Sequence, residues 1–134
     1  MKIIFLSFLL IMYLSLNAQE QFAVYFDVDE AIADTTSQKR LQDWIKNNKN
    51  ITVTKIIGYA DSTWTPEYNA HLSRRRAEFV LQQLKNSKIG LAENVEVKGF
   101  GETTVFSENK SNDRVVIIYY EVPKLKIKKD SRLS

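Results

Sequence analysis

The order in which strand-like and helix-like segments alternate is the feature that most constrains this chain. Four runs are rich in Val, Ile, Thr and aromatic residues, as strands are: residues 22–26, 51–59, 95–98 and 115–122. Each of the first two runs is followed by a segment with apolar residues at spacings of three and four, which predicts a helix. One such segment begins at Ser37, and the other runs from Pro66 to about Asn86. The predicted order is therefore βαβαββ.

Helices that connect successive strands pack on the sheet that those strands form. We therefore predict an α/β protein with the layers of an α+β sandwich, in which two main helices pack on a mixed four-stranded sheet. A length of 134 residues suits one domain of this kind. We expect the domain to span residues 19–123, because no internal repeat or interdomain linker interrupts that range.

The N-terminus has the pattern of a signal peptide over residues 1–18. Lys2 supplies a positive charge, residues 3–14 form an almost continuous apolar run, and Ala18 is a small residue suited to cleavage. A permanent membrane anchor is the alternative, but the apolar run is well short of the roughly 20 residues that a spanning helix needs. No later segment is long and apolar enough to cross a bilayer. We therefore expect an exported chain whose mature form has no transmembrane segment.

Charge and composition exclude several functional classes. The formal net charge is +3, yet the expected basic tail, residues 124–134, has five Lys and Arg residues against one Asp. The preceding domain is therefore near neutral, unlike a nucleic-acid-binding domain with a basic face. The absence of cysteine excludes disulfides and thiol nucleophiles, and the single histidine, His71, lies on the outward face of its helix. We expect no nucleic-acid partner, no metal, no cofactor and no catalytic residue, and hence no enzyme.

The second predicted helix has two polar residues on its apolar side. At about 100° per residue, with Leu72 at zero, the apolar sector is centred near about 60°, and it contains Arg76 at about 40° and Asn69 at about 60°. A buried guanidinium needs a carboxylate or another strong acceptor. The nearest candidate is Asp61, in the loop that leads into this helix. From patterning alone, a structural ion pair and a ligand site explain the pair equally well.

Several ordered motifs resemble those of the OmpA-like peptidoglycan-binding domain. They are residues 57–61 (IGYAD), 68–69 (YN) and 72–77 (LSRRRA), with the flanking residues 24–27 (VYFD), 97–102 (VKGFGE) and 112–115 (NDRV). The resemblance covers nearly all of residues 22–122. Two positions depart from the family pattern. Trp64 stands where the family usually has glycine, and Asp113 replaces the first of two consecutive arginines, so that Arg114 alone remains.

The resemblance implies a binding function. Members of the family bind the diaminopimelate of the peptidoglycan stem peptide with an aspartate after the second strand and an arginine in the second helix, which correspond to Asp61 and Arg76. Asn69 is expected to orient the bound group through its amide. Thr63 and Asp27 are weaker candidates, at the rim or in positioning the loop. The resemblance also implies a location in the Gram-negative periplasm, associated with the outer membrane or with an envelope protein partner.

Two points are left open by the residues. Trp64 can narrow the mouth of the site, stack over the aliphatic stem of a ligand, or pack its own loop against the domain. The competing function is an interaction module, a periplasmic adaptor with the same fold that does not bind the wall. In that module Asp61 and Arg76 are a structural pair.

Overall fold

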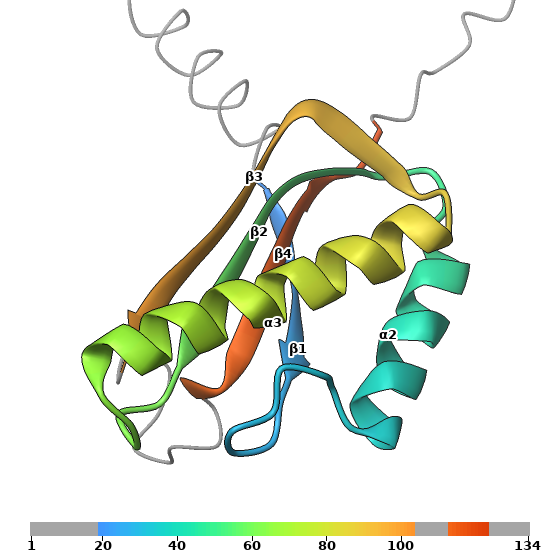
Figure 1. Cartoon of the computed structure of the whole chain (residues 1–134). Helices are drawn as coiled ribbons and strands as arrows, with labels where there is room; N and C mark the ends of the chain where they lie inside the picture. The colour runs from blue at the N-terminus through green and yellow to red at the C-terminus, as the bar shows by residue number, and fades with distance from the viewer. Residues whose placement is uncertain (1–18, 104–112, 124–134) are drawn as a thin grey trace, which may run out of the picture.

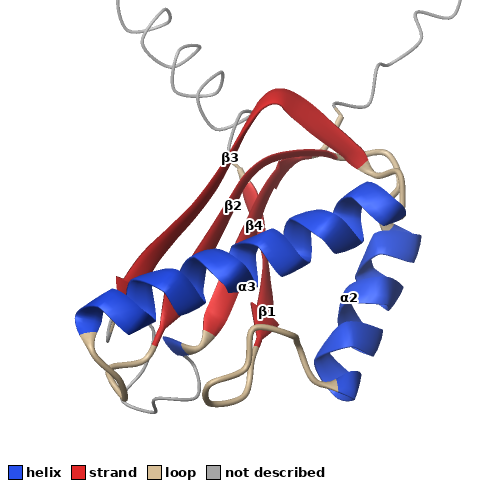
Figure 2. Ribbon diagram, viewed as in Figure 1, coloured by secondary structure: helices blue, strands red, loops and turns tan. Residues whose placement is uncertain are grey.

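The computed structural model describes residues 19–103 and 113–123. Its elements, in chain order, are β1 (Glu20–Tyr25), α2 (Thr35–Asn47), β2 (Thr52–Ala60), α3 (Pro66–Asn86), β3 (Gly90–Glu102) and β4 (Val115–Glu121). The strands form one sheet in the order β1-β4-β2-β3 (Figure 1). Figure 2 shows both helices in front of this sheet. The predicted α/β fold, with two helices on a four-stranded sheet, is confirmed.

The sheet is mixed because α3 is a crossover connection. β2 and β3, which α3 joins, are parallel, whereas β4 is antiparallel to both of its neighbours, β1 and β2. The β1–β4 register pairs Glu20 with Tyr120 at one end and Tyr25 with Val115 at the other. The second of these ends is the one at which β2 finishes, since Gly58 pairs with Val116. The ends of β1, β2 and the beginning of β4 therefore meet at one edge of the domain.

Several element boundaries differ from the sequence prediction, and those of α2 and β3 have a clear physical reason. α2 begins two residues earlier than predicted, because the carboxylate of Asp34 accepts a hydrogen bond of 2.7 Å from the backbone N–H of Ser37 and so caps the helix. β3 begins at Gly90 instead of residue 95, since the short turn after α3 brings the chain directly alongside Thr52 and Val53 of β2. Backbone pairing thus extends the strand through residues with low β-propensity.

Helix α3 lies very close to the sheet at two glycines. A Cβ atom at Gly58 would lie 2.0 Å from the carbonyl oxygen of Ser73, and one at Gly99 would lie 2.3 Å from the backbone nitrogen of Arg74. Ser73 is itself fully buried, and its hydroxyl accepts a hydrogen bond of 2.8 Å from the backbone N–H of Gly101. The glycines therefore let the first half of α3 settle over the carboxyl end of β2.

The hydrophobic core fills the space between the helices and the sheet. Its fully buried members include Leu41, Val53, Ile56, Val80, Leu84, Val116 and Ile118. Phe22 of β1 stacks on Trp44 of α2, with ring centroids 4.6 Å apart, and this contact closes the α2 end of the core. In the part of the chain that the structure describes, no helix has the length and apolar character to cross a membrane. The predicted signal peptide and basic tail lie outside the described residues.

Candidate ligand site around Asp61

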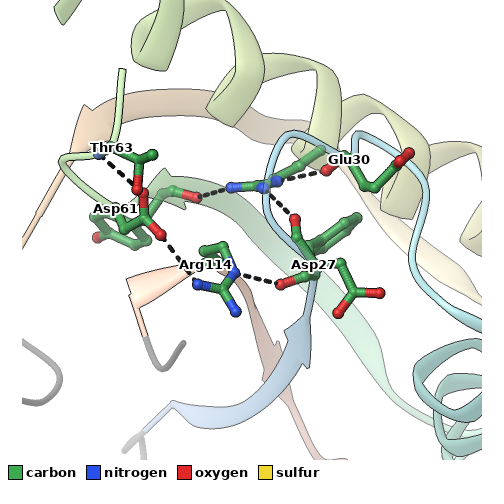
Figure 3. Close-up of polar contacts among 8 residues, drawn as sticks. Asp27, Glu30, Asp61, Thr63 and Arg114 are labelled. Carbon is green, nitrogen blue, oxygen red and sulfur yellow. Dashed lines mark hydrogen bonds and ion pairs between the residues drawn. The ribbon is translucent and has the colours of Figure 1, made fainter. Parts of the chain in front are cut away.

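Asp61 is a buried carboxylate at the carboxyl end of β2. It is 4% exposed, and its Oδ1 accepts a hydrogen bond of 3.0 Å from the backbone N–H of Thr63. Its Oδ2 lies 3.0 Å from Nη1 of Arg114, which forms an ion pair with it (Figure 3). Burial by itself raises the pKa of Asp61, but the hydrogen bonds from Thr63 and Arg114 and the charge of Arg114 outweigh it and lower the pKa. The side chain is therefore ionised at neutral pH.

Arg114 lies directly before β4 and joins three elements. Its Nε donates a hydrogen bond of 2.9 Å to the carbonyl of Phe26, while its own carbonyl accepts one of 2.9 Å from the N–H of Phe26. Its side chain is 15% exposed, so it is the more accessible partner of the pair with Asp61, whose side chain is 6% exposed. From the sequence, Arg114 was noted only as the arginine that remains in a motif that differs from the family pattern, and its pairing with Asp61 was not predicted. An arginine adjoining the buried run of β4 was the signal available.

Arg76 is completely buried and binds main-chain carbonyls. Its Nε and Nη2 each donate a hydrogen bond of 2.8 Å, to the carbonyls of Glu30 and Asp27, and its Nη1 donates one of 3.3 Å to the carbonyl of Tyr59. Its Cζ also lies 5.3 Å from the ring centroid of Phe26. Arg76, which lies on α3, thus connects the loop after β1 with the end of β2.

The direct ion pair between Asp61 and Arg76 expected from the sequence is not what the structure shows. Three carbonyls satisfy the guanidinium without desolvating a second charge, and Asp61 pairs with Arg114 instead. The two groups still interact electrostatically. Burial lowers the pKa of Arg76 to about 10, and the charge of Asp61 partly opposes this effect. Arg76 therefore stays positively charged at neutral pH, and its charge attracts the carboxylate of Asp61 over a longer distance.

Asn69 is fully buried one turn after the start of α3. Its Nδ2 donates to the carbonyl of Trp64 at 3.1 Å and to Oε2 of Glu102 at 3.2 Å. Both partners accept hydrogen bonds, which suits the amide nitrogen as the donor. Its Oδ1 has no hydrogen-bond partner among the residues that the structure describes.

Asp27 and Thr63 are the two remaining predicted site residues. The carbonyl of Asp27 accepts from Arg76, while both the backbone N–H and the side chain of Thr63 hydrogen-bond to Asp61 and lower its pKa (Figure 3). Both residues are exposed. Within residues 19–103 and 113–123, no group of three or more His, Asp or Glu side chains is arranged to hold a metal ion.

The chain is similar in sequence to known proteins. The family model described as the OmpA family matches residues 25–117. Outer membrane protein 41 of Porphyromonas gingivalis is 36% identical over 107 residues, which are 76% of this chain but 26% of that protein. The chain thus spans about a quarter of the length of this relative.

Solved structures agree on the fold. The peptidoglycan-associated lipoprotein from Burkholderia pseudomallei has a TM-score of 0.59 and 25% identity, with 74% of this chain and 89% of that chain covered. The periplasmic domain of Helicobacter pylori MotB, at 13% identity, shares the fold with a TM-score of 0.60, covering 78% of this chain and 83% of that chain. Members of the matched family are typically associated with peptidoglycan and the cell envelope, as structural or binding proteins. On the extent of the family match, this chain belongs to the OmpA family.

Proposed function

We propose that this domain binds peptidoglycan non-covalently, through the diaminopimelate of the stem peptide, at the cluster of Asp61, Arg76 and Arg114. The observation that carries the proposal is the buried, ionised carboxylate of Asp61 between two guanidinium groups, one in direct contact and one acting at longer range. The free end of diaminopimelate carries an ammonium and a carboxylate together. One negative and two positive side chains can satisfy both of these groups.

Binding on this proposal is an exchange of partners. The ligand ammonium takes the place of Arg114 at Asp61, and the ligand carboxylate then receives the released Arg114. Arg76 assists from beneath, since three of its five N–H groups donate to carbonyls and two are left for a further acceptor. Because Arg114 is partly exposed and Arg76 is fully buried, Arg114 is the side chain that moves. This extends the pair of ligand residues predicted from the sequence by one arginine.

Asn69 supports the ammonium end of the ligand. Its Oδ1 is the buried acceptor without a partner, and its amide is held by Trp64 and Glu102 on the side away from that oxygen. A ligand ammonium, with three N–H donors, can satisfy Asn69 and Asp61 at once. Lysine lacks the second carboxylate, so a wall with lysine in the stem peptide leaves an arginine unpaired and is expected to bind more weakly.

The test is binding of purified protein to isolated sacculi and to free diaminopimelate. Asp61→Asn keeps the shape of the side chain and removes its charge, and it is expected to weaken binding by about 30-fold or more, because the ligand ammonium loses its ionic partner. Arg74→Gln is the matched control, since Arg74 lies on the same helix as Arg76, is exposed, and pairs with Glu78. Equal binding by the wild type and Asp61→Asn contradicts recognition at this site.

A second candidate is the adaptor without wall binding. The observation that favours it is that Asp61 and Arg76 already have partners inside the domain, as structural charges do. It predicts no diaminopimelate binding by the wild type, and capture of an envelope protein instead. The sacculus experiment separates the two functions, because only the wall-binding domain is retained on sacculi in a manner that Asp61→Asn abolishes.

The setting of the domain follows from the same proposal. Residues 1–18 direct export, residues 19–123 act as the wall-binding domain, and residues 124–134 are a basic tail. The domain works in the periplasm and associates with the outer membrane through an envelope protein partner. It needs no cofactor and performs no catalysis.

A further inference from the structure

Trp64 and Tyr68 form an exposed aromatic pair beside the loop that holds Asp61. Trp64 is 48% exposed and Tyr68 is 38% exposed. Their ring centroids are 5.7 Å apart with an interplanar angle of 62°, which is an edge-to-face contact. Trp64 is the residue after Thr63, whose N–H binds Asp61. Two large rings thus face solvent next to the charge cluster, where burial would ordinarily be favoured.

Polar contacts hold this pair in place. The carbonyl of Trp64 accepts the hydrogen bond from Asn69, and the N–H of Tyr68 donates to Oγ1 of the capping Thr65 at 3.2 Å. The Tyr68 hydroxyl donates to the carboxylate of Asp29, in the loop whose carbonyls Arg76 binds. Both aromatic residues are therefore anchored to the network that surrounds Asp61.

The loop on the far side of Tyr68 contains a residue in the left-handed region. Asp29 has a φ of 59°, a conformation that aspartate tolerates better than most residues other than glycine. Such conformations persist where the surrounding structure maintains them, and they are enriched at ligand sites. Here the contacts from Tyr68 and Arg76 on either side maintain it. The ring of Tyr68 is preorganised as a result, so little conformational entropy is lost when a ligand covers it.

We propose that Trp64 and Tyr68 bind an N-acetylhexosamine ring of the wall glycan strand, next to the stem peptide; this rests on the proposed wall-binding function. The C–H groups on one face of a pyranose ring carry partial positive charge and pack against the negative face of an aromatic ring. The pair itself is uncharged, so it suits the neutral glycan better than the charged end of the stem peptide. A stem peptide held at Asp61 brings the glycan to which it is attached against the same rim.

The experiment uses two probes that separate the glycan from the stem peptide. Chitotetraose, a β-1,4-linked tetramer of N-acetylglucosamine, contains no peptide, and free diaminopimelate contains no sugar. Each is titrated into the full mature protein by calorimetry and by saturation-transfer NMR. Trp64→Ala is expected to weaken chitotetraose binding by about tenfold and to leave diaminopimelate binding within about twofold of the wild type.

Two further variants test the geometry. Tyr68→Phe keeps the ring and removes the hydroxyl bond to Asp29, so it is expected to weaken chitotetraose binding by less than Trp64→Ala does. Phe100→Ala is the matched control, since Phe100 is 62% exposed and stacks on Tyr59, with ring centroids 5.8 Å apart, away from the aromatic pair. Near-ultraviolet circular dichroism confirms that each variant is folded.

The outcomes distinguish this inference from the proposed function. Loss of chitotetraose binding in Trp64→Ala but not in Asp61→Asn or Phe100→Ala supports the glycan subsite. No chitotetraose binding by the wild type, or equal binding by Trp64→Ala, overturns the subsite even if diaminopimelate binds at Asp61. Absent diaminopimelate binding together with Trp64-dependent chitotetraose binding overturns the proposed stem-peptide site and leaves the glycan subsite standing.

Discussion

The two halves of α3 pack on the same sheet and bury different chemistry. In the half that begins at Pro66, the buried side chains are Asn69, Leu72, Ser73 and Arg76. In the half that ends at Asn86, they are Ala77, Val80 and Leu84. One half of the helix therefore contributes a polar network to the domain, and the other half contributes ordinary hydrophobic core.

The difference shows that burial alone does not identify a residue's role. Val80 and Leu84 stabilise the domain by removing apolar surface from water. Arg76 and Asn69 have to recover the cost of their own desolvation, and they do so by binding carbonyls and a carboxylate at the loops that end β1, β2 and β3. The polar half thereby fixes the positions of the loops around Asp61. In the polar half, the same side chains stabilise the fold and position the loops around Asp61. In the apolar half, the buried side chains stabilise the fold alone.

The largest expected effect comes from breaking the polar half at its centre. Arg76→Met keeps an unbranched apolar stem but removes the three hydrogen bonds to the carbonyls of Asp27, Glu30 and Tyr59. Of these carbonyls, that of Asp27 also accepts from the N–H of Glu30 and keeps this second donor. The loss is expected to lower the free energy of unfolding by about 3–5 kcal/mol. Leu84→Ala is the counterpart in the apolar half, with an expected loss of about 3 kcal/mol. Urea unfolding measures both variants.

Binding then separates these two variants. Under conditions where both are folded, Leu84→Ala is expected to retain affinity for sacculi, and Arg76→Met is expected to lose it. Equal retention of wall binding by both variants contradicts the coupling of stability to ligand geometry in the polar half.

An intermediate effect is expected for Asn69→Leu. The two side chains branch in the same way, but leucine is larger and removes the hydrogen bonds from Asn69 to the carbonyl of Trp64 and to the carboxylate of the exposed Glu102. We therefore expect a loss of about 1–3 kcal/mol in the free energy of unfolding. Gln82→Leu, at an exposed position on the same helix, is the control and is expected to change stability by less than about 0.5 kcal/mol. A neutral or stabilising Asn69→Leu shows that this part of the network is not needed for folding.

The smallest effect is the pH dependence that Asp61 contributes. Its pKa is lower in the folded protein than its ordinary value of about 4, so its stabilising contribution is present above that value and is lost as pH falls through the folded pKa. The stability difference between the wild type and Asp61→Asn is therefore expected to be constant from pH 7 to about pH 5 and to shrink below about pH 4. Urea midpoints at several pH values measure it. A difference that stays constant down to the lowest pH at which both proteins fold contradicts the lowered pKa.

Helical periodicity and capping chemistry were enough to predict much of the fold and part of the site. Thr65 and Pro66 mark the start of α3 because a side-chain acceptor and a residue without an N–H suit that position, and the structure has the helix begin there. The same periodicity placed Asn69 and Arg76 on the inward face, where they are fully buried. These are local properties, so the sequence contains them.

Partners that are distant in the chain were harder to predict. The pairing of Asp61 with Arg114 spans 53 residues and depends on the position of β4 between β1 and β2. The carbonyl partners of Arg76 could not be identified at all, because every residue has a carbonyl and only the path of the backbone decides which ones converge. Sequence reasoning required a carboxylate or another strong acceptor for Arg76 and named Asp61 as the nearest candidate, whereas the acceptors in the structure are three carbonyls.

The β1–β4 register determines how the domain would carry a mechanical load. Glu20 and Glu121 lie at the end of the sheet opposite Asp61, because Glu20 pairs with Tyr120 and Tyr25 pairs with Val115. A tension between a ligand held at Asp61 and either end of the described domain therefore runs along the strands. A load applied at Glu20 passes from β1 through β4 to β2, whereas a load applied at Glu121 passes from β4 to β2. In each case the hydrogen bonds between neighbouring strands are loaded together in shear and not peeled apart one at a time.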